Sequence, residues 1–327
     1  MIGSNQFSFG LAYAMPWLGH DKRLKRQKPL DLFGFMEKCR EFGLDGIQLA
    51  DSQLDSYDEA YLGGVKDRAK ALGLYLQFSH SGSLSDPFIE KHICAANILD
   101  CKIMRTTIGM LLRQTTIRTR DDWHKFRKAT LGYASNIAQL GRKYGVKIAI
   151  ENHFGDVTAE ELLDVIEVDN GYLGVCFDTA NSFSVAQEPA WTANLLARHV
   201  IASHLKDFLA VETSTGCTLY AVPLGQGHVD LEDCVKAVQQ YNPDVMFTLE
   251  MVSGRTFNVP FLDESFYPGY DERDASDIVR VLRLIRDNPK KVPSTFVHLE
   301  QFTDDDLEYE DSNVRECVKY AREVLKI

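Results

Sequence analysis

Apolar residues recur along this chain in two alternating patterns. In short runs every second residue is apolar, and in longer stretches the apolar residues lie three or four positions apart. The first pattern predicts β-strands and the second predicts helices that bury one face. The expected strands are residues 8–12, 46–49, 74–78, 102–105, 147–151, 172–178, 200–206 and 246–251.

Helical stretches separate these runs, and most of them carry recognisable end signals. Gly43, Gly73 and Gly145 stand where a helix usually stops, and Thr158 with Glu161 forms a capping box that opens a helix. The expected helices are residues 30–42, 61–72, a helix opened by Asp86-Pro87, residues 123–144, the helix after Thr158, a helix through Leu231, Val235 and Val238, and residues 275–286 and 313–325.

Eight strands alternating with helices predict a parallel sheet, and the number eight favours a closed (β/α)8 TIM barrel. An open doubly wound sheet is the alternative, but no GxGxxG follows a strand to support a dinucleotide site. We expect a single domain over residues 1–327, with the barrel at about 7–287 and a C-terminal extension at about 288–327.

Two segments exceed what a barrel needs. The first is a basic loop, which we expect to be solvated, with a phosphate or partner contact as the alternative; it contains Lys22, Arg23, Lys25, Arg26 and Lys28. The second is an aromatic-rich C-terminal tail that begins at Ser253 and could cover the active face or pack against another subunit. Its aromatic residues include Phe257, Phe261, Phe266, Tyr267 and Tyr270.

The composition narrows the class of protein. The chain has 327 residues, of which 45% are hydrophobic and 25% charged, so a large core is available. Its net charge of -11 disfavours binding to nucleic-acid phosphates. We expect neither a signal peptide nor a membrane span, because the chain has no run of about 18 apolar residues. The seven scattered cysteines contain no CxxC pair and indicate reduced thiols in a cytoplasmic enzyme.

Four consecutive expected strands carry a polar residue at or near the carboxyl end: strands five, six and eight end in Glu151, Asp178 and Glu250, and strand seven carries His204. In a parallel barrel these ends open onto one face, so three carboxylates and one imidazole would meet there. Buried together, the carboxylates would repel each other unless they take up protons or a cation. Each residue alone could instead be a capping or salt-bridge group. Jointly they predict a divalent metal ion, with Mn²⁺ preferred and Mg²⁺, Co²⁺ or Zn²⁺ as alternatives.

The segments IAIENH, GVCFDTANS, SHLKD, VPLGQGHVD and TLEM, in this order, resemble the sugar phosphate isomerase/epimerase superfamily. This is the xylose isomerase-like TIM barrel group, to which endonuclease IV is also related. The similarity covers roughly residues 40–254 and is greatest to the catalytic α subunits of C-glycoside deglycosidases. The resemblance implies the same four metal ligands, β-elimination from a 3-oxo-C-glycoside, and a small β subunit within a hetero-oligomer.

A metal that chelates a sugar ketone and its neighbouring hydroxyl needs a base to remove the α proton. His153 follows the strand end at Glu151 and suits a general base near neutral pH, although it could be a hydrogen-bonded loop histidine. Glu151 and Glu250 are competing bases. Lys206 lies on the same strand face as His204 and could stabilise enolate charge.

Four further polar residues are candidates for binding sugar hydroxyls: His80, Arg105, Asn152 and Asn181. Arg105 could equally form a structural ion pair, and the two asparagines could support the ligands. Asp207, after Lys206, is expected to form an ion pair or a loop cap. Cys176 lies two residues before Asp178, so we expect it to point inward as packing.

These residues favour a metal-dependent lyase that removes the proton next to the ketone of a 3-oxo-glycoside and expels its aglycone. A keto-sugar isomerase or epimerase would use the same site and is the principal alternative. A phosphodiesterase of the endonuclease IV type is disfavoured, because it would need more histidine ligands and a basic face. A metal-stabilised scaffold without catalysis has no specific support.

Overall fold

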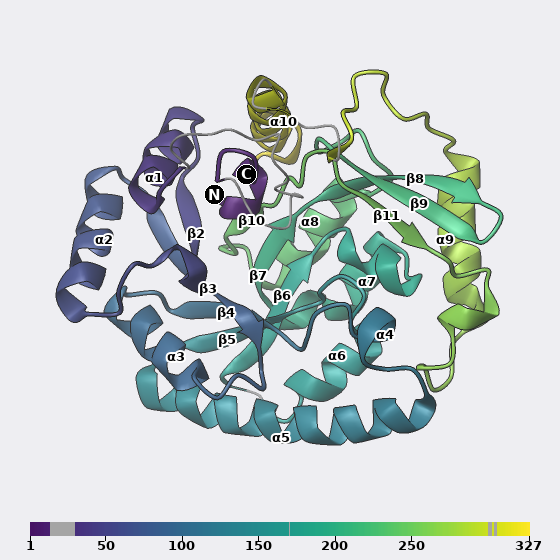
Figure 1. Cartoon of the computed structure of the whole chain (residues 1–327), viewed down its shortest axis with the longest axis horizontal. Coiled ribbons are helices and arrows are strands. Elements are labelled where there is room, and N and C mark those ends of the chain that lie inside the picture. Colours follow the sequence, from purple (N-terminus) through teal and green to yellow (C-terminus); the bar gives the residue numbers. More distant parts are fainter. Residues whose placement is uncertain (14–29, 170, 300–302, 304–305) are drawn as a thin grey trace.

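Eight parallel strands form a closed barrel in the computed structural model, which describes residues 1–13, 30–169, 171–299, 303 and 306–327 (Figure 1). The expected (β/α)8 fold is therefore confirmed. Around the barrel the strands are β1 (Ile2–Asn5), β10 (Phe247–Leu249), β7 (Val200–Leu205), β6 (Leu173–Asp178), β5 (Lys147–Glu151), β4 (Ile103–Thr107), β3 (Tyr75–Ser83) and β2 (Gly46–Ala50).

Helices surround the barrel and pack apolar faces onto the strands (Figure 1). The longest, α5, begins with the capping box of Thr119 and Asp122 and ends at Gly145, whose φ is 69°. The capping box at Thr158 opens α6 as the sequence predicts. The helices are α1 (Leu32–Glu41), α2 (Glu59–Ala71), α3 (Ile89–Ile98), α4 (Leu112–Thr115), α5 (Arg120–Tyr144), α6 (Ala159–Ile166), α7 (Pro189–Leu196), α8 (Leu231–Tyr241), α9 (Ala275–Asp287) and α10 (Leu307–Tyr320).

The first strand lies earlier than the sequence pattern predicts. The expected strand at residues 8–12 is wrong, because β1 ends at Asn5 and residues Gln6–Phe9 form a 3₁₀ turn. The side chain of Asn5 accepts the backbone N–H of Phe7, and this local bond replaces a strand ladder. The apolar side chains that suggested a strand, such as Phe9, are buried by the turn instead.

A small antiparallel sheet follows β7 and was not expected from the sequence. Its strands are β8 (Asp207–Thr213), β9 (Gly216–Val222) and β11 (Thr256–Val259), in the order β11-β9-β8. Only Lys206 separates β7 from β8, so the apolar pattern runs on without a turn signal. Asp207 starts β8 and accepts the backbone N–H groups of Gly225, Gly227 and Val229, in agreement with its expected capping role.

The C-terminal segment covers two sides of the barrel. Helix α9 packs against β8, whereas α10 packs against the 3₁₀ turn after β1 (Figure 1). Glu310 on α10 is buried, and its carboxylate accepts the N–H groups of Leu11 and Ala12 at 2.7 and 3.1 Å. Burial raises the pKa of Glu310 to about 7, although these two N–H groups lower it.

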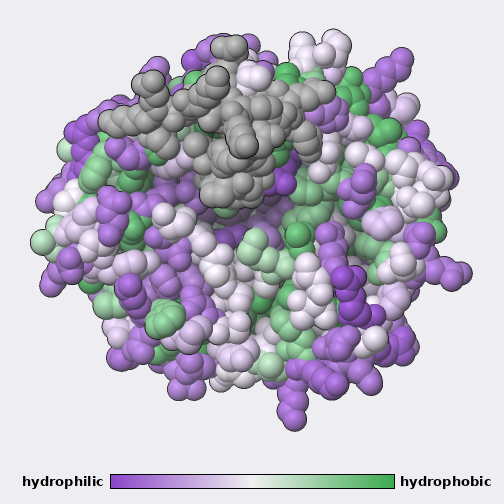
Figure 2. All heavy atoms as spheres, viewed as in Figure 1, coloured by the Kyte–Doolittle hydropathy of each residue, from purple (hydrophilic) through white to green (hydrophobic). Residues whose placement is uncertain are grey.

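Several other expectations can be compared with the described residues. All seven cysteines are free thiols. Among the described residues, no helix has both the length and the apolar character needed to cross a bilayer. On the face shown in Figure 2, hydrophilic residues occupy much of the outline, with apolar residues interspersed among them. The basic loop at residues 22–28 lies outside the described residues.

Candidate metal centre and active site

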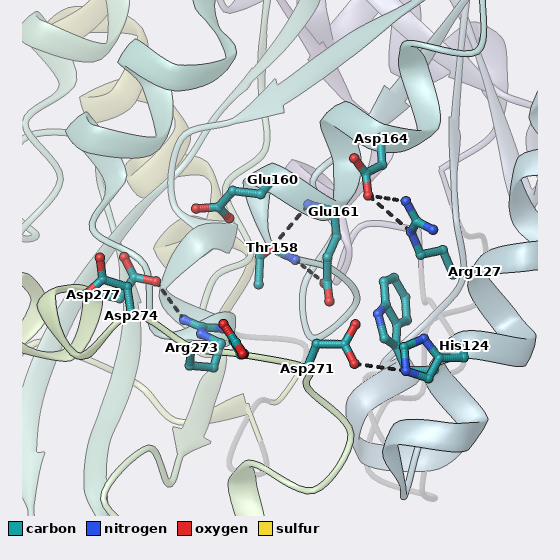
Figure 3. A pocket seen from close by; sticks show the side chains of 12 residues that line it. His124, Arg127, Thr158, Glu160, Glu161, Asp164, Asp271, Arg273, Asp274 and Asp277 are labelled. Atoms are coloured by element: carbon teal, nitrogen blue, oxygen red, sulfur yellow. Dashed lines mark hydrogen bonds and ion pairs between the residues drawn. The ribbon is translucent and has the colours of Figure 1, made fainter.

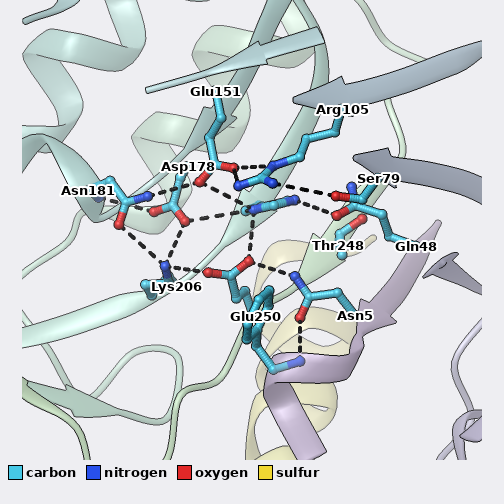
Figure 4. Close-up of polar contacts among 12 residues, drawn as sticks. Asn5, Gln48, Ser79, Arg105, Glu151, Asp178, Asn181, Lys206, Thr248 and Glu250 are labelled. Carbon is cyan, nitrogen blue, oxygen red and sulfur yellow. Dashed lines mark hydrogen bonds and ion pairs between the residues drawn. The ribbon is translucent and has the colours of Figure 1, made fainter. Parts of the chain in front are cut away.

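The four predicted metal ligands converge toward the carboxyl ends of their strands, and Figure 4 shows Glu151, Asp178 and Glu250 among them. Glu151 and Asp178 are the last residues of β5 and β6, His204 lies in β7, and Glu250 directly follows β10. His204 Nδ1 is 3.0 Å from Glu250 Oε2, 3.7 Å from Glu151 Oε1 and 3.9 Å from Asp178 Oδ2. All four side chains are buried. The barrel therefore brings one imidazole nitrogen and three carboxylates around a common point.

The hydrogen bonding of this group fits a divalent cation. His204 Nε2 is 2.9 Å from Gln48 Oε1, which can only accept, so Nε2 carries the proton and Nδ1 presents its lone pair to the carboxylates. Among the described residues, His204 Nδ1 is buried and makes no hydrogen bond, and Asp178 Oδ2 has only its ion pair with Lys206. One imidazole nitrogen and several carboxylate oxygens that converge in this way are the donor set of a divalent-metal site once Nδ1 has given up any proton it carries.

Two cations border the ligands and partly compensate their charge. Lys206 Nζ lies 2.6 Å from Glu250 Oε1 and 2.9 Å from Asp178 Oδ2. Arg105 donates Nε–H to Glu151 Oε2 at 2.5 Å. Arg105 therefore forms the structural ion pair that was one of the two roles considered for it, and it also lines the cavity.

The protonation of the carboxylates follows from burial and from these partners. Burial would raise the pKa of Glu151, but Arg105 and then His204 hold it well below its usual range. Burial would likewise raise the pKa of Glu250, and Lys206 with His204 outweighs this effect. Burial does raise the pKa of Asp178, with Lys206 opposing and the other two carboxylates adding to the rise. Two of the three carboxylates are thus held ionised.

The two predicted asparagines have different positions. Asn181 lines the cavity, donates Nδ2–H to Glu151 Oε1 at 3.0 Å and accepts from Lys206 Nζ at 3.3 Å. Asn152 instead donates to the carbonyl of Asp178 and accepts its N–H, at 2.9 and 2.7 Å. Asn152 therefore holds the end of β6 in place, and the geometry gives no support to a hydroxyl contact by its amide.

His153 lies beside the metal ligands with its ring on the cavity wall. Its Nδ1 is 3.4 Å from Oδ2 of Asp156, a fully buried carboxylate that the sequence analysis did not single out. Burial lowers the pKa of His153, but Asp156 and then Glu151 outweigh burial and raise it above its ordinary value. Asp156 comes three residues after His153 in a loop, and this spacing alone carries no strand or helix signal.

His80 does not line the cavity. It belongs to β3, and its ring turns toward α3, where Nε2 lies 2.7 Å from Asp86 Oδ2 and Nδ1 lies 3.1 Å from Thr106 Oγ1. The ring of His92 lies 4.5 Å from it, centroid to centroid. The structure therefore places His80 in a polar network behind the wall, and the hypothesis of a sugar contact has no support in this geometry.

Three further residues lie against the predicted metal ligands in positions that the sequence did not indicate. Asn5 donates Nδ2–H to Glu250 Oε2 at 2.6 Å, and Gln48 orients His204 as described above. Cys176 points inward, as expected, but its sulfur also lies within 4.8 Å of a carboxylate oxygen of Glu151 and a ring nitrogen of His204. These contacts join different barrel strands, so they become visible only when the barrel is closed.

The cavity above the ligands has a volume of about 680 Å³, within the roughly 300–1,000 Å³ range of small-molecule sites. Its floor is polar, and one wall is apolar. The ring centroids of Phe154 and Phe257 lie 4.4 Å apart, and the ring of Phe208 contacts that of Phe257 edge-on, with 5.7 Å between centroids. Phe257 thus covers the active face, one of the two roles considered for the aromatic tail. Apolar and aromatic lining residues are Phe7, Tyr13, Met110, Leu111, Phe154, Phe208, Val252 and Phe257.

A second hollow of about 550 Å³ lies outside the barrel, among α5, α6 and the segment before α9 (Figure 3). Carboxylates dominate it, and two of them have basic partners: Asp164 with Arg127 at 2.6 Å, and Asp271 with His124 at 3.2 Å. These pairs connect neighbouring surface elements. None of its described lining residues lies on a barrel strand, so this hollow is separate from the cavity above the strand ends.

Comparison with known proteins agrees with this architecture. Residues 36–285 match the family model described as xylose isomerase-like TIM barrel. Over 207 residues the chain is 26% identical to 3-oxo-isoapionate decarboxylase of Pectobacterium atrosepticum, covering 62% of this chain and 71% of that protein.

Solved structures share the fold at low sequence identity. The 3-keto-D-glucoside 4-epimerase of E. coli has a TM-score of 0.56 at 14% identity, over 88% of this chain and 99% of that one. The IolI protein, crystallised with a bound zinc atom, has a TM-score of 0.55 at 12% identity, over 99% and 98% of the two chains.

Proposed function

The chain belongs to the xylose isomerase-like TIM barrel family, and from this premise we propose that it is a divalent-metal-dependent lyase acting on a 3-oxo-glycoside. The enzyme would remove the proton α to the ketone and eliminate the aglycone, in the manner of a C-glycoside deglycosidase. The names of its relatives support a keto-sugar as substrate, since one is a 3-oxo-isoapionate decarboxylase and another a 3-keto-D-glucoside 4-epimerase.

One observation carries the choice of elimination over epimerisation. Both oxygens of Glu151 are engaged, Oε2 by Arg105 and Oε1 by Asn181, whereas the imidazole of His153 faces the cavity. An epimerase must remove a proton on one face of the substrate and return one on the other. A carboxylate that already accepts two hydrogen bonds is a poor base, because these bonds stabilise its ionised form. A single imidazole base fits a reaction that removes one proton and expels a leaving group.

The steps assigned to the chain follow from this arrangement. Glu151, Asp178, His204 and Glu250 would hold the metal, which when bound would polarise the sugar ketone. His153 takes the α proton, and the electron pair of that C–H bond forms a double bond as the bond to the aglycone breaks. Lys206, whose ammonium group reaches the floor of the cavity, stabilises the negative charge that develops on the ketone oxygen. His153 then returns this proton to the departing aglycone, so the products are the free aglycone and an unsaturated keto-sugar, and the imidazole is neutral again.

The size and shape of the cavity support a substrate larger than a single sugar. The polar floor suits sugar oxygens, and the wall formed by Phe154, Phe208 and Phe257 suits an apolar leaving group. A keto-sugar isomerase or epimerase remains the second candidate, since it would use the same metal ligands and family relatives carry that name. The net charge of -11 and the single histidine among the four ligands disfavour a phosphodiesterase.

Product analysis tests the proposal. The Mn²⁺-loaded protein is incubated with a panel of 3-oxo-glycosides and 3-oxo-sugar acids, and products are identified by mass spectrometry and NMR. We expect free aglycone and an unsaturated keto-sugar, in equal amounts. Recovery of an epimer or isomer without aglycone release would replace the proposal with the second candidate, and release of CO₂ from a sugar acid would indicate a decarboxylase. The Glu250→Gln variant is the matched control for metal dependence.

A further inference from the structure

Asp156 is the buried partner of a histidine that faces the cavity. Its side chain is fully buried, and that of His153 is 22% exposed. His153 Nδ1 and Asp156 Oδ2 lie 3.4 Å apart, and neither atom has a hydrogen-bond partner among the described residues. A buried polar atom without a hydrogen bond costs free energy. The facing nitrogen of His153 and oxygen of Asp156 are therefore most stable when a proton lies between them.

The loop holds Asp156 rigidly in this orientation. Its other oxygen, Oδ1, accepts the N–H of Leu112 at 3.2 Å, and its carbonyl accepts from Arg113 Nε at 3.1 Å. Gly155, whose φ is 72°, donates its N–H to Ser184 Oγ at 2.7 Å and accepts from the N–H of Arg113. These bonds join the loop to α4 and to the segment after β6. The carboxylate therefore cannot turn away from His153 without breaking the bond to Leu112.

From this geometry we propose that Asp156 is a positioning residue that fixes the ring orientation and the tautomer of His153. With its proton on Nδ1 directed at Asp156, the neutral ring presents the lone pair of Nε2 to the cavity, where a proton can be accepted. Without Asp156, the ring could rotate or adopt the other tautomer, in which Nε2 carries the proton and cannot act as a base. The inference relies on the proposed function only for the identity of the proton that Nε2 receives.

Asp156→Asn is the direct test, because the amide oxygen can still accept the N–H of Leu112 while its NH₂ group cannot accept a proton from Nδ1. ¹⁵N NMR of histidine-labelled protein, loaded with diamagnetic Mg²⁺, reports the tautomer of each imidazole, and the signal missing from His153→Gln assigns His153. We expect Nδ1 to be protonated in the wild type and the tautomer to shift toward Nε2–H in Asp156→Asn. A wild-type His153 protonated on Nε2, or an unchanged tautomer in the variant, would overturn the proposal. The wild-type spectrum alone decides the matter should the variant not fold.

Kinetics provide the second readout. On any substrate that the wild type converts, Asp156→Asn should lower kcat about 100-fold or more while KM changes little, since substrate binding does not involve Asp156. Asp86→Asn is the matched control, because it alters a similar His–Asp pair, that of His80, behind the cavity wall, and should leave kcat near the wild-type value. An unchanged kcat in Asp156→Asn would contradict the proposal. If the wild type converts no 3-oxo-glycoside, the proposed function fails, and the NMR result still decides the role of Asp156.

Discussion

Arg105 and Asn181 share the carboxylate of Glu151: Arg105 donates to Oε2 and Asn181 to Oε1. The same oxygen, Oε1, lies 3.7 Å from His204 Nδ1, so it faces the other metal ligands. The guanidinium of Arg105 therefore keeps Glu151 ionised through Oε2, while Oε1 remains directed at the point where a cation would bind.

Replacement of Arg105 by Met should destabilise the metal-free protein by about 3–5 kcal/mol, because it leaves a buried carboxylate without its partner. A divalent ion would compensate part of this loss, since less positive charge then opposes its binding. We expect Mn²⁺ to raise the free energy of unfolding more in Arg105→Met than in the wild type, as measured by denaturant unfolding with and without the ion.

The control for this experiment is Arg127→Met, which removes an exposed ion pair with Asp164. An exposed pair contributes at most about 1 kcal/mol, and its loss should not depend on Mn²⁺. Equal stabilisation by Mn²⁺ in the wild type and in Arg105→Met would contradict the assignment of Glu151 as a metal ligand.

Chelation should remove activity, and Mn²⁺ should restore it. An ion at 100 times its Kd should also stabilise the folded chain by about 2.7 kcal/mol, which calorimetry can detect as a rise in Tm. Asp178→Asn should abolish this rise, whereas Asp164→Asn, at a surface carboxylate, should preserve it. Full activity of rigorously metal-free protein would exclude the metal mechanism.

Replacement of His153 by Gln should slow exchange of the substrate α proton by about 100-fold or more, because the base is lost. Exchange is followed by NMR in D₂O, and metal content is measured in parallel and should be unchanged. Exchange at the wild-type rate would transfer the role of base to Glu151 or Glu250.

Glu310 predicts a pH dependence of stability that is independent of the active site. Its pKa is raised in the fold from 4.5 to about 7, so between these values the unfolded chain releases this proton while the folded chain retains it. The folded state then binds more protons, and the free energy of unfolding falls as pH rises, by about 3 kcal/mol across the window. In Glu310→Gln, urea unfolding from pH 4.5 to 7 should show a correspondingly smaller decline. An identical decline in both proteins would rule out this assignment.

The barrel could be predicted from the sequence because seven of its eight strands coincide with an apolar run and most of its helices have their own periodicity. The four ligand positions could be predicted for the same reason, since strand ends in a parallel barrel share one face. The 3₁₀ turn after β1 could not, because the side-chain cap from Asn5 decides between turn and strand. The antiparallel sheet was missed where β8 continues β7 after a single residue.

The orientation of individual polar side chains was harder to predict than their location. His80 lies within β3 and Asn152 directly follows β5, yet the first turns toward His92 of α3 and the second toward the backbone of Asp178. Their directions depend on partners distant in sequence, as does the pairing of Gln48 with His204. A sequence pattern gives the strand and its face, whereas contacts between strands decide which group reaches the cavity.

The antiparallel sheet after β7 contributes to the cavity wall but supplies none of the predicted metal ligands. These ligands all stand on or beside barrel strands, whereas Phe208 and Phe257 reach the cavity from β8 and β11. Residues of this sheet can therefore vary in size without disturbing the ligand geometry. Exchange of the sheet between relatives would be expected to transfer substrate preference, and it gives protein engineering a module that is distinct from the reaction centre.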